Sequence, residues 1–299
     1  LAEGERIPPI IANFRDMKIP ECVIAHLAKK GIQTPSPIQM QGLPTAFSGR
    51  DMIGIAFTGS GKTLTFSLPL ILFAVEAERR LAFDASDGPL GLIICPSREL
   101  ARQTYESIKA LAEALEHGGY ARISALLCIG GINMAEQSHV LRTGFHIVVA
   151  TPGRLWDVLK QNDGFARRMR QARFLVIDEA DRMVEAGHFA EMDAILRMVR
   201  RTAGAIPANP DMQTLVFSAT MAKSLQQNLK RKQWRKKKRS AEPTNTLDDL
   251  LSRVDFRDED VAIVDLVTEK RVASNLLEAK IECIGKEKDA YLYYLLMRY

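Results

Sequence analysis

The sequence predicts an α/β protein in which a parallel sheet is flanked by helices on both faces. From residue 51 onward, apolar runs of strand length alternate with longer segments whose apolar residues follow helical spacing. The strand-like runs are continuously apolar, which indicates strands that are buried on both faces of the sheet. The expected strands are residues 52–56, 90–95, 123–129, 146–150, 174–177 and 214–217, and the expected helices are 64–80, 98–116, 133–142, 154–160 and 189–201.

The composition is that of a soluble globular protein. The 299 residues are enough for one large α/β domain with extensions or for two smaller domains, and 46% of them are apolar. The longest apolar stretch, 64–75, is interrupted by Ser67 and Pro69 and is too short to span a bilayer, so we expect no membrane segment. No secretory signal is visible. Because the first residue is Leu1, we expect the chain to be a piece of a longer protein.

The cysteines indicate a reducing intracellular compartment and no zinc site. The four cysteines are scattered, without a Cys-x-x-Cys pair and without a histidine at metal-ligand spacing. They are Cys22, Cys95, Cys128 and Cys283.

The net charge of +5 depends on one segment, residues 230–239, which contains eight basic residues and no acidic one. The rest of the chain has 33 basic and 36 acidic residues. Any affinity of the main body for nucleic acid must therefore come from a local arrangement of side chains rather than from bulk charge.

Residues 1–50 precede the first expected strand. Three prolines make residues 1–21 mostly extended, and a short helix is expected over 21–30, ending at Gly31. Ser36 is placed to cap a second helix with Pro37 at its first position. This rigid turn fixes Gln39, whose side-chain amide offers one donor and one acceptor to the edge of adenine. The alternative is that Gln39 is an ordinary surface residue.

Residues 56–63 read Ala-Phe-Thr-Gly-Ser-Gly-Lys-Thr and follow an expected strand. A strand, a glycine-rich turn and a helix in this order form a phosphate-binding loop, because backbone N–H groups and the helix N-terminus converge on one anion. Lys62 is expected to reach the β- and γ-phosphates and Thr63 to contact Mg²⁺. The first glycine of the usual pattern is Ala56 here.

The expected strand 174–177 is followed by Asp178-Glu-Ala-Asp181. An aspartate that ends a buried strand beside a phosphate loop holds Mg²⁺ through water, and the next glutamate orients or deprotonates the attacking water. The alternative is that Asp178 only caps a helix.

The other strands also end in polar turns. Because ligands of parallel sheets bind beyond the carboxyl ends of the strands, these turns are expected to lie on one edge. Hydroxyls, bare backbone N–H groups and guanidinium groups there can hold a phosphodiester backbone without reading bases. The alternative for each of these residues is a purely structural role, as a helix cap, as part of a tight turn or as a surface arginine. The turns are Pro96–Gln103, Gly130-Gly131, Thr151-Pro-Gly-Arg154 and Ser218-Ala-Thr220.

In order and spacing, these turns resemble the motifs of the DEAD-box family of ATP-dependent RNA helicases. The resemblance covers about residues 10–222 and implies the first of the family's two RecA-like domains. Residues 31–39 look like its Q motif, 56–63 like motif I, 96–103 like motif Ia, 130–131 like the GG motif, 151–154 like motif Ib, 178–181 like motif II and 218–220 like motif III.

The resemblance implies a role for each matching residue. Phe14, which lies 17 residues before Gly31, would stack on adenine, and Gln39 would read the edge of the base. ATP would also contact Thr58, Gly59, Ser60, Gly61, Lys62, Thr63 and Leu64. Catalysis would use Lys62, Asp178 and Glu179, with Mg²⁺ at Thr63 and Asp178. Asp181, Ser218 and Thr220 would couple nucleotide state to RNA binding. RNA would contact Ser97, Arg98, Gly131, Thr151, Gly153 and Arg154.

The two halves of the chain resemble different subfamilies. Residues 7–150 look like the Abstrakt-type nuclear DEAD-box proteins. From Thr151 on, the chain looks more like nucleolar DEAD-box helicases of large-subunit ribosome assembly, which also insert a charged segment after motif III. The resemblance therefore implies a nuclear or nucleolar location and pre-ribosomal or other ribonucleoprotein partners.

These observations predict five regions. They are an N-terminal flank with the Q motif (1–50), a RecA-like domain (51–221), a charged, mobile insertion (222–260), a last strand with a linker (261–280) and the start of a second domain (281–299). The basic segment 230–239 is a solvated part of the insertion, a nuclear localisation signal or an RNA-binding arm.

In the family, the second domain supplies arginine fingers, which contribute about 10³–10⁵-fold in rate. We therefore expect this chain to bind ATP or ADP weakly and to hydrolyse little. Two alternatives remain open at this point: an RNA clamp that uses ATP without unwinding, and a DNA translocase, against which Phe14, Gln39 and the acidic turn argue.

Overall fold

The computed structural model describes residues 2–3, 8–80, 89–131, 144–199, 212–220, 246–254, 256–266 and 283–298. The chain divides into two compact units, Leu1–Val267 and Thr268–Tyr299. The expected helix 133–142, the basic segment 230–239 and the linker after residue 266 lie outside the described residues.

The first unit is built on an eight-stranded sheet with the order β1-β8-β2-β7-β6-β3-β5-β4. Seven strands are parallel, and β1 pairs with β8 in the antiparallel direction. All of the strands expected from 52 to 217, and the expected last strand, are confirmed within a few residues at each end. The strands are β1 (Ala2–Glu3), β2 (Met52–Ile55), β3 (Gly91–Ile94), β4 (Ala125–Cys128), β5 (Ile147–Ala150), β6 (Phe174–Ile177), β7 (Gln213–Ser218) and β8 (Ala262–Asp265).

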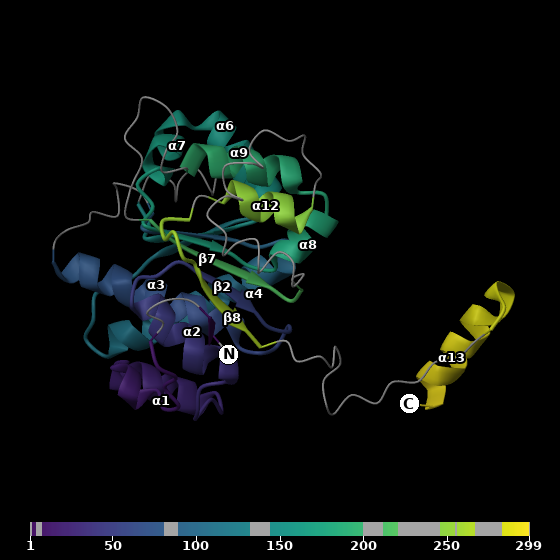
Figure 1. Ribbon diagram of the computed structural model, residues 1–299, viewed down its shortest axis with the longest axis horizontal. Helices are drawn as coiled ribbons and strands as arrows, with labels where there is room; N and C mark the ends of the chain where they lie inside the picture. Colours follow the sequence, from purple (N-terminus) through teal and green to yellow (C-terminus); the bar gives the residue numbers. More distant parts are fainter. Residues whose placement is uncertain are drawn as a thin grey trace. The chain divides into compact units, whose positions relative to one another are not determined.

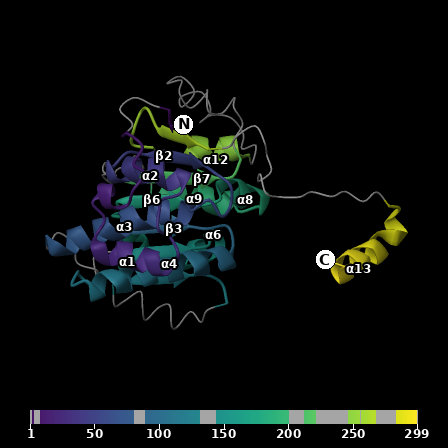
Figure 2. The ribbon, with the colours of Figure 1, turned by 90° about the horizontal axis from the view of Figure 1, so that it is seen from below.

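Helices cover both faces of this sheet (Figures 1 and 2). One layer contains α1 (Glu21–Lys29), α2 (Pro37–Phe47), α3 (Lys62–Arg79) and α4 (Arg98–His117). The other contains α6 (Pro152–Gln161), α7 (Asp163–Met169), α8 (Ala180–Glu185), α9 (Phe189–Val199) and α12 (Leu247–Arg253). A single 3₁₀ turn, η1 (Arg15–Met17), precedes α1. The short helices α7 and α8 were not expected, because six or seven residues are too few to establish a helical period.

Alternate residues of each strand enter two separate cores. Ile53 and Ile55 of β2 belong to the core under α6–α9, whereas Met52 belongs to the core under α1–α4. Val148 and Ala150 of β5 also belong to the core under α6–α9. This arrangement explains why β2, β3, β5 and β6 are apolar at every position, because each of their side chains is buried on one face of the sheet or the other.

The prediction that residues 222–260 form a mobile insertion was wrong for its last part. Residues 247–253 form helix α12, in which Leu250 and Leu251 are at most 1% exposed, and Phe256 beyond it is 4% exposed. The Arg253 guanidinium also pairs with Asp193 of α9 at 2.8 Å. The high charge of the whole segment concealed a short helix whose few apolar residues all face the core. Residues 222–245 lie outside the described residues.

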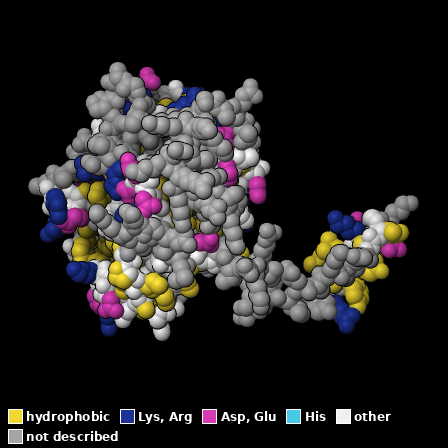
Figure 3. All heavy atoms as spheres, viewed as in Figure 1, with side chains coloured by type: hydrophobic (Ala, Val, Ile, Leu, Met, Phe, Trp, Pro, Cys, Tyr) yellow, Lys and Arg dark blue, Asp and Glu magenta, His cyan; other side chains and the backbone are white. Residues whose placement is uncertain are grey.

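The second unit contains a 3₁₀ turn, η4 (Gly285–Glu287), and helix α13 (Lys288–Arg298). Six apolar or aromatic side chains of α13 are between 42% and 74% exposed, and they form the yellow patches on this helix in Figure 3. They are Tyr291, Leu292, Tyr293, Tyr294, Leu296 and Met297. None of the helices described in either unit is long and apolar enough to span a membrane.

Candidate nucleotide and nucleic-acid site

The phosphate loop lies between β2 and α3, as expected. Gly59 and Gly61 have φ values of 82° and 96°, in the left-handed region that side chains with a Cβ rarely adopt. A Cβ on Gly61 would also lie 2.4 Å from Nε2 of Gln39. The loop conformation therefore requires glycine at both positions, and at Gly61 the close approach of Gln39 requires it as well.

Gln39 holds the phosphate loop against α2. Its Oε1 accepts a hydrogen bond from the backbone N–H of Ser36 at 2.9 Å, and its Nε2 donates to the Gly61 carbonyl at 3.1 Å. The Ser36 hydroxyl donates to the Ser60 carbonyl at 2.6 Å. The predicted helix start is confirmed, with Ser36 as N-cap and Pro37 at the first position. Gln39 is 4% exposed, so it lies inside the fold rather than on the surface.

The loop retains donors that suit a phosphate. The Lys62 ammonium donates to the Ala56 carbonyl at 2.8 Å, which uses one of its three N–H groups. The hydroxyl of Ser60 is buried and, among the described residues, has no hydrogen-bond partner. A buried polar atom without a partner is costly, and a phosphate oxygen in the loop would supply one. The Thr63 side chain is half-buried at the first turn of α3.

The acidic turn follows β6, and Asp178 and Glu179 are 2% and 4% exposed. Burial raises the pKa of the Asp178 carboxyl to about 6, although the Lys62 ammonium lowers it in part. Glu179 has a φ of 48°, a left-handed conformation that is uncommon outside glycine. Its Oε1 accepts a hydrogen bond from the Thr58 hydroxyl at 3.2 Å, and its Oε2 pairs with Arg182 at 3.2 Å. The phosphate loop and the acidic turn are therefore in direct contact.

Asp181 connects the acidic turn to the turn after β7. Its Oδ2 accepts hydrogen bonds from the Thr220 hydroxyl at 2.9 Å and from the backbone N–H groups of Ala219 and Thr220. The Ser218 hydroxyl donates to the Thr220 carbonyl at 2.7 Å. The structure thus brings together all three residues that were predicted to couple the sites.

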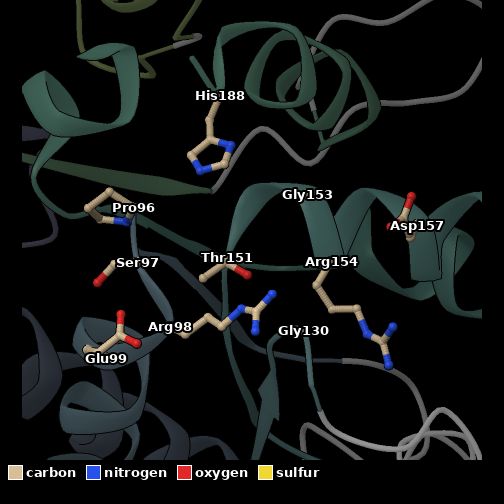
Figure 4. Close-up of a pocket in the computed structure, with 10 residues that line it drawn as sticks. All are labelled: Pro96, Ser97, Arg98, Glu99, Gly130, Thr151, Gly153, Arg154, Asp157 and His188. Atoms are coloured by element: carbon tan, nitrogen blue, oxygen red, sulfur yellow. The ribbon is translucent and has the colours of Figure 1, made fainter. Parts of the chain in front are cut away.

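Five of the six predicted nucleic-acid residues line a cavity of about 540 Å³ (Figure 4). Its lining residues are Pro96, Ser97, Arg98, Glu99, Gly130, Thr151, Gly153, Arg154, Asp157 and His188. The sixth predicted residue, Gly131, lines a second cavity, which shares Arg98, Glu99 and Gly130 with the first. The Arg98 guanidinium lies against Gly130, where an added Cβ would be 2.9 Å from Nη2, and close to Gly131, which has a φ of 87°. Ser97 caps α4 by accepting a hydrogen bond from the Leu100 N–H, so its ordinary role as a cap is also present.

The sequence profile of the DEAD/DEAH box helicase family matches residues 36–228, well over half of the chain. The chain belongs to the DEAD/DEAH box helicase family. It is 47% identical over 228 residues to a probable ATP-dependent RNA helicase, ddx41, of Dictyostelium discoideum, which covers 76% of this chain and 32% of that protein. It is 36% identical over 298 residues to the ATP-dependent RNA helicase mak5 of Sclerotinia sclerotiorum, covering 97% of this chain and 37% of that protein. The chain thus spans about a third of the length of these relatives.

The solved helicase structures share this fold. The chain matches the RNA helicase Prp28 of Chaetomium thermophilum, bound to ADP, with a TM-score of 0.65 and 27% identity, over 99% of this chain and 60% of that one. A DEAD box protein of Methanococcus jannaschii matches with a TM-score of 0.57 and 26% identity, over 75% of this chain and 54% of that one. The parallel sheet with helices on both faces is therefore the RecA-like fold of DEAD-box domains.

Phe14, predicted from the DEAD-box resemblance to stack on adenine, is 1% exposed and belongs to the core under α1–α4. In this structure its ring packs against protein, so the stacking role stays a prediction. The sequence did not identify His188 as part of the site. A single histidine between Gly187 and Phe189 gives no local signal, and only the packing of α9 brings it to the cavity.

Proposed function

We propose that this chain is the nucleotide-binding first half of an ATP-dependent RNA helicase, which couples ATP binding and hydrolysis to RNA binding and local duplex unwinding. The observation that carries the proposal is the hydrogen bond between Thr58 of the phosphate loop and Glu179 of the acidic turn, at 3.2 Å. A phosphate held by the loop would lie beside the carboxylate that orients the attacking water.

The residues have separate tasks in this proposal. Lys62 and the loop N–H groups bind the phosphates, while Gln39 fixes the loop and presents its amide to adenine. Among the described residues, no cluster of three or more His, Cys, Asp or Glu side chains could hold a metal ion. Mg²⁺ would therefore rely on Asp178, on Thr63 and on oxygens of water and phosphate, and it would neutralise phosphate charge when bound. Glu179, fixed by Thr58 and Arg182, would orient the water.

The order of the strands supports a link between nucleotide and RNA. The nucleotide turns follow β2, β7 and β6, and the turns of the cavity follow the next strands, β3, β5 and β4. Asp181 accepts three hydrogen bonds from Ala219 and Thr220 in the turn after β7. A shift of the acidic turn would therefore also move the turn after β7. The RNA contacts proposed here are Ser97, Arg98, Gly131, Thr151, Gly153 and Arg154.

The longer protein would complete the site. We propose that the second unit begins a second RecA-like domain, which is supported by the exposed apolar side chains of α13. That domain would supply arginine fingers, so this chain by itself is expected to bind ATP or ADP weakly and to hydrolyse little.

We further propose a nuclear, nucleolar role in ribosome assembly. The support is the alignment with the mak5 helicase over 97% of the chain, compared with 76% for the Drosophila melanogaster helicase abstrakt, and the resemblance of the second half of the sequence to the nucleolar group. Immunofluorescence of the longer protein against a nucleolar marker would test this; a cytoplasmic distribution would contradict it.

Nucleotide binding is tested by titrating fluorescent ADP into the purified chain in the presence of Mg²⁺. Lys62→Ala is expected to weaken binding at least tenfold, because the loss of a charge-assisted hydrogen bond costs about 1.5–3 kcal/mol. Lys109→Ala, at an exposed pair with Glu113 on α4, is the matched control. Equal affinity of Lys62→Ala and the unsubstituted chain would refute the assignment.

Unwinding is tested on the longer protein. ATP-dependent displacement of a short RNA strand is expected, and Glu179→Gln is expected to abolish turnover. Tight ATP-dependent RNA binding without displacement would favour a clamp. Equal stimulation of ATP hydrolysis by DNA and RNA would favour a DNA translocase.

A further inference from the structure

The connection between α8 and α9 holds His188 at the rim of the cavity. The backbone N–H of His188 donates to the Met183 carbonyl at 3.1 Å, and its carbonyl accepts from the Met192 N–H at 3.0 Å. The backbone is therefore fixed on both sides, by the end of one helix and the start of the next. The ring is half-buried and points towards Thr151, from the side of the cavity opposite to Arg98 and Gly130 (Figure 4).

The imidazole of His188 differs from that of a histidine with a structural role. His146 is 4% exposed, and both of its ring nitrogens are used: Nδ1 accepts from the Ser124 N–H at 3.1 Å, and Nε2 lies 2.5 Å from Glu78. Within the part of the chain that the structure describes, the His188 ring makes no hydrogen bond and no ion pair. A ring that is fixed at its backbone and faces a cavity is available to a ligand.

The charged groups of the cavity indicate which class of ligand the His188 ring could bind. Arg98 and Glu99 come from α4, and Arg154 and Asp157 come from α6. Two guanidinium groups, the Thr151 hydroxyl and the imidazole can all donate hydrogen bonds into the same space, which suits a ligand with anionic oxygens.

We propose that His188 is a further nucleic-acid contact, which donates a hydrogen bond to a phosphate oxygen of the RNA strand from the side opposite to Arg98. The inference rests on the proposed function, since it adds a third element, the α8–α9 connection, to a groove otherwise formed by turns at strand ends.

The test uses the purified chain and a fluorescently labelled single-stranded oligouridine, with binding followed by anisotropy. His188→Ala removes the ring donor, whereas His188→Gln keeps a neutral donor at this position. His117→Ala is the matched control, because His117 is exposed at the other end of α4, about 30 Å from the cavity for a helix of 20 residues. The unsubstituted chain and His117→Ala are expected to bind alike, and His188→Ala is expected to bind about threefold to tenfold more weakly, with part of the loss restored in His188→Gln.

A strand without bases distinguishes a phosphate contact from stacking on a base. His188→Ala is expected to weaken the binding of an abasic oligonucleotide of the same length by the same factor as the binding of oligouridine. A loss of affinity for oligouridine alone would overturn the proposal, because it would indicate that the ring stacks on a base.

Arg98→Ala separates this inference from the proposed function. If Arg98→Ala weakens RNA binding but His188→Ala keeps the affinity of the unsubstituted chain, the role of His188 is refuted and the RNA groove stands. If the chain does not bind RNA at all, the proposed RNA groove and the role of His188 both fail.

Discussion

The side-chain amide of Gln39 donates a hydrogen bond from Nε2 to the carbonyl oxygen of Gly61 at 3.1 Å, which joins helix α2 to the phosphate loop. The same amide accepts from the Ser36 N–H, and Ser36 in turn donates to the Ser60 carbonyl. The bonds to Gly61 and Ser60 hold the loop from outside, across more than twenty residues of sequence, and the bond from the Ser36 N–H fixes the Gln39 amide itself. The loop conformation that suits a phosphate is therefore supported before any nucleotide binds.

We predict that Gln39→Ala weakens the binding of fluorescent ADP about tenfold and lowers the free energy of unfolding by about 1–3 kcal/mol, because it leaves the Ser36 N–H and the Gly61 carbonyl without their partner. Titration and urea denaturation measure the two effects. Gln161→Ala, at an exposed site near the end of α6, is the control and is expected to change neither. Unchanged affinity in Gln39→Ala would show that nucleotide binding by the loop does not depend on the hydrogen bonds of Gln39.

Gly130 is predicted to matter for binding but not for stability. The Cβ of Gly130→Ala would lie 2.9 Å from Nη2 of Arg98, and because this is the end of a flexible side chain, the guanidinium can move away at little cost. RNA affinity is expected to fall about threefold to tenfold, as for a displaced phosphate contact, while the melting temperature changes by less than about 2 °C.

The control for an added methyl group is Gly164→Ala within α7, where the nearest atom to the new Cβ is 3.4 Å away, on Asn162. It is expected to preserve RNA binding. Equal RNA affinity of Gly130→Ala and Gly164→Ala would show that the position of Arg98 over Gly130 is unimportant.

Asp51 is predicted to make stability depend on pH. Its carboxylate is 0% exposed and accepts hydrogen bonds from the N–H groups of Thr214 at 2.7 Å and Asp258 at 2.9 Å. Burial nevertheless raises the pKa of Asp51 to about 6, since these two bonds offset it only in part. The folded state then holds the proton more tightly than the unfolded state does, so the contribution of this group to stability is lost as the pH rises from about 4 to 6.

The contribution is at most about 3 kcal/mol, for a difference of about two pKa units at 1.36 kcal/mol each. Urea denaturation at pH 4 and pH 7 measures most of it, and Asp51→Asn is expected to remove this part of the difference. The substitution also turns an NH₂ group towards the Asp258 N–H, so the variant is expected to be less stable at both pH values. An identical pH dependence in both proteins would contradict the assignment to Asp51.

Helix α12 is predicted to contribute to the stability of the first unit. Leu251 is 1% exposed, so Leu251→Ala should lower the free energy of unfolding by about 2–4 kcal/mol. Leu247→Ala, on the same helix but only half-buried, should cost less than half as much. Chemical denaturation measures both. If the segment were mobile, as its charge suggested, both variants would match the unsubstituted chain.

The sequence alone determined the strands and the chemistry of the turns. Periodicity and turn residues are local properties, so β2 to β8, the cap at Ser36, the phosphate loop at 56–63 and the acidic turn at 178–181 could all be predicted. The family resemblance then supplied roles that individual residues could not, such as that of Asp181 towards Ser218 and Thr220.

The tertiary structure decided which of these turns meet. The order β2-β7-β6-β3-β5-β4 depends on long-range packing of strands and helices that no local pattern encodes, and this order places Thr58 on Glu179 and the cavity beside the nucleotide turns. The same packing brought His188 to the cavity, covered Phe14 and folded α12 onto α9. In each of these cases the side chain's surroundings come from distant segments, so its own sequence neighbourhood gave no sign of them.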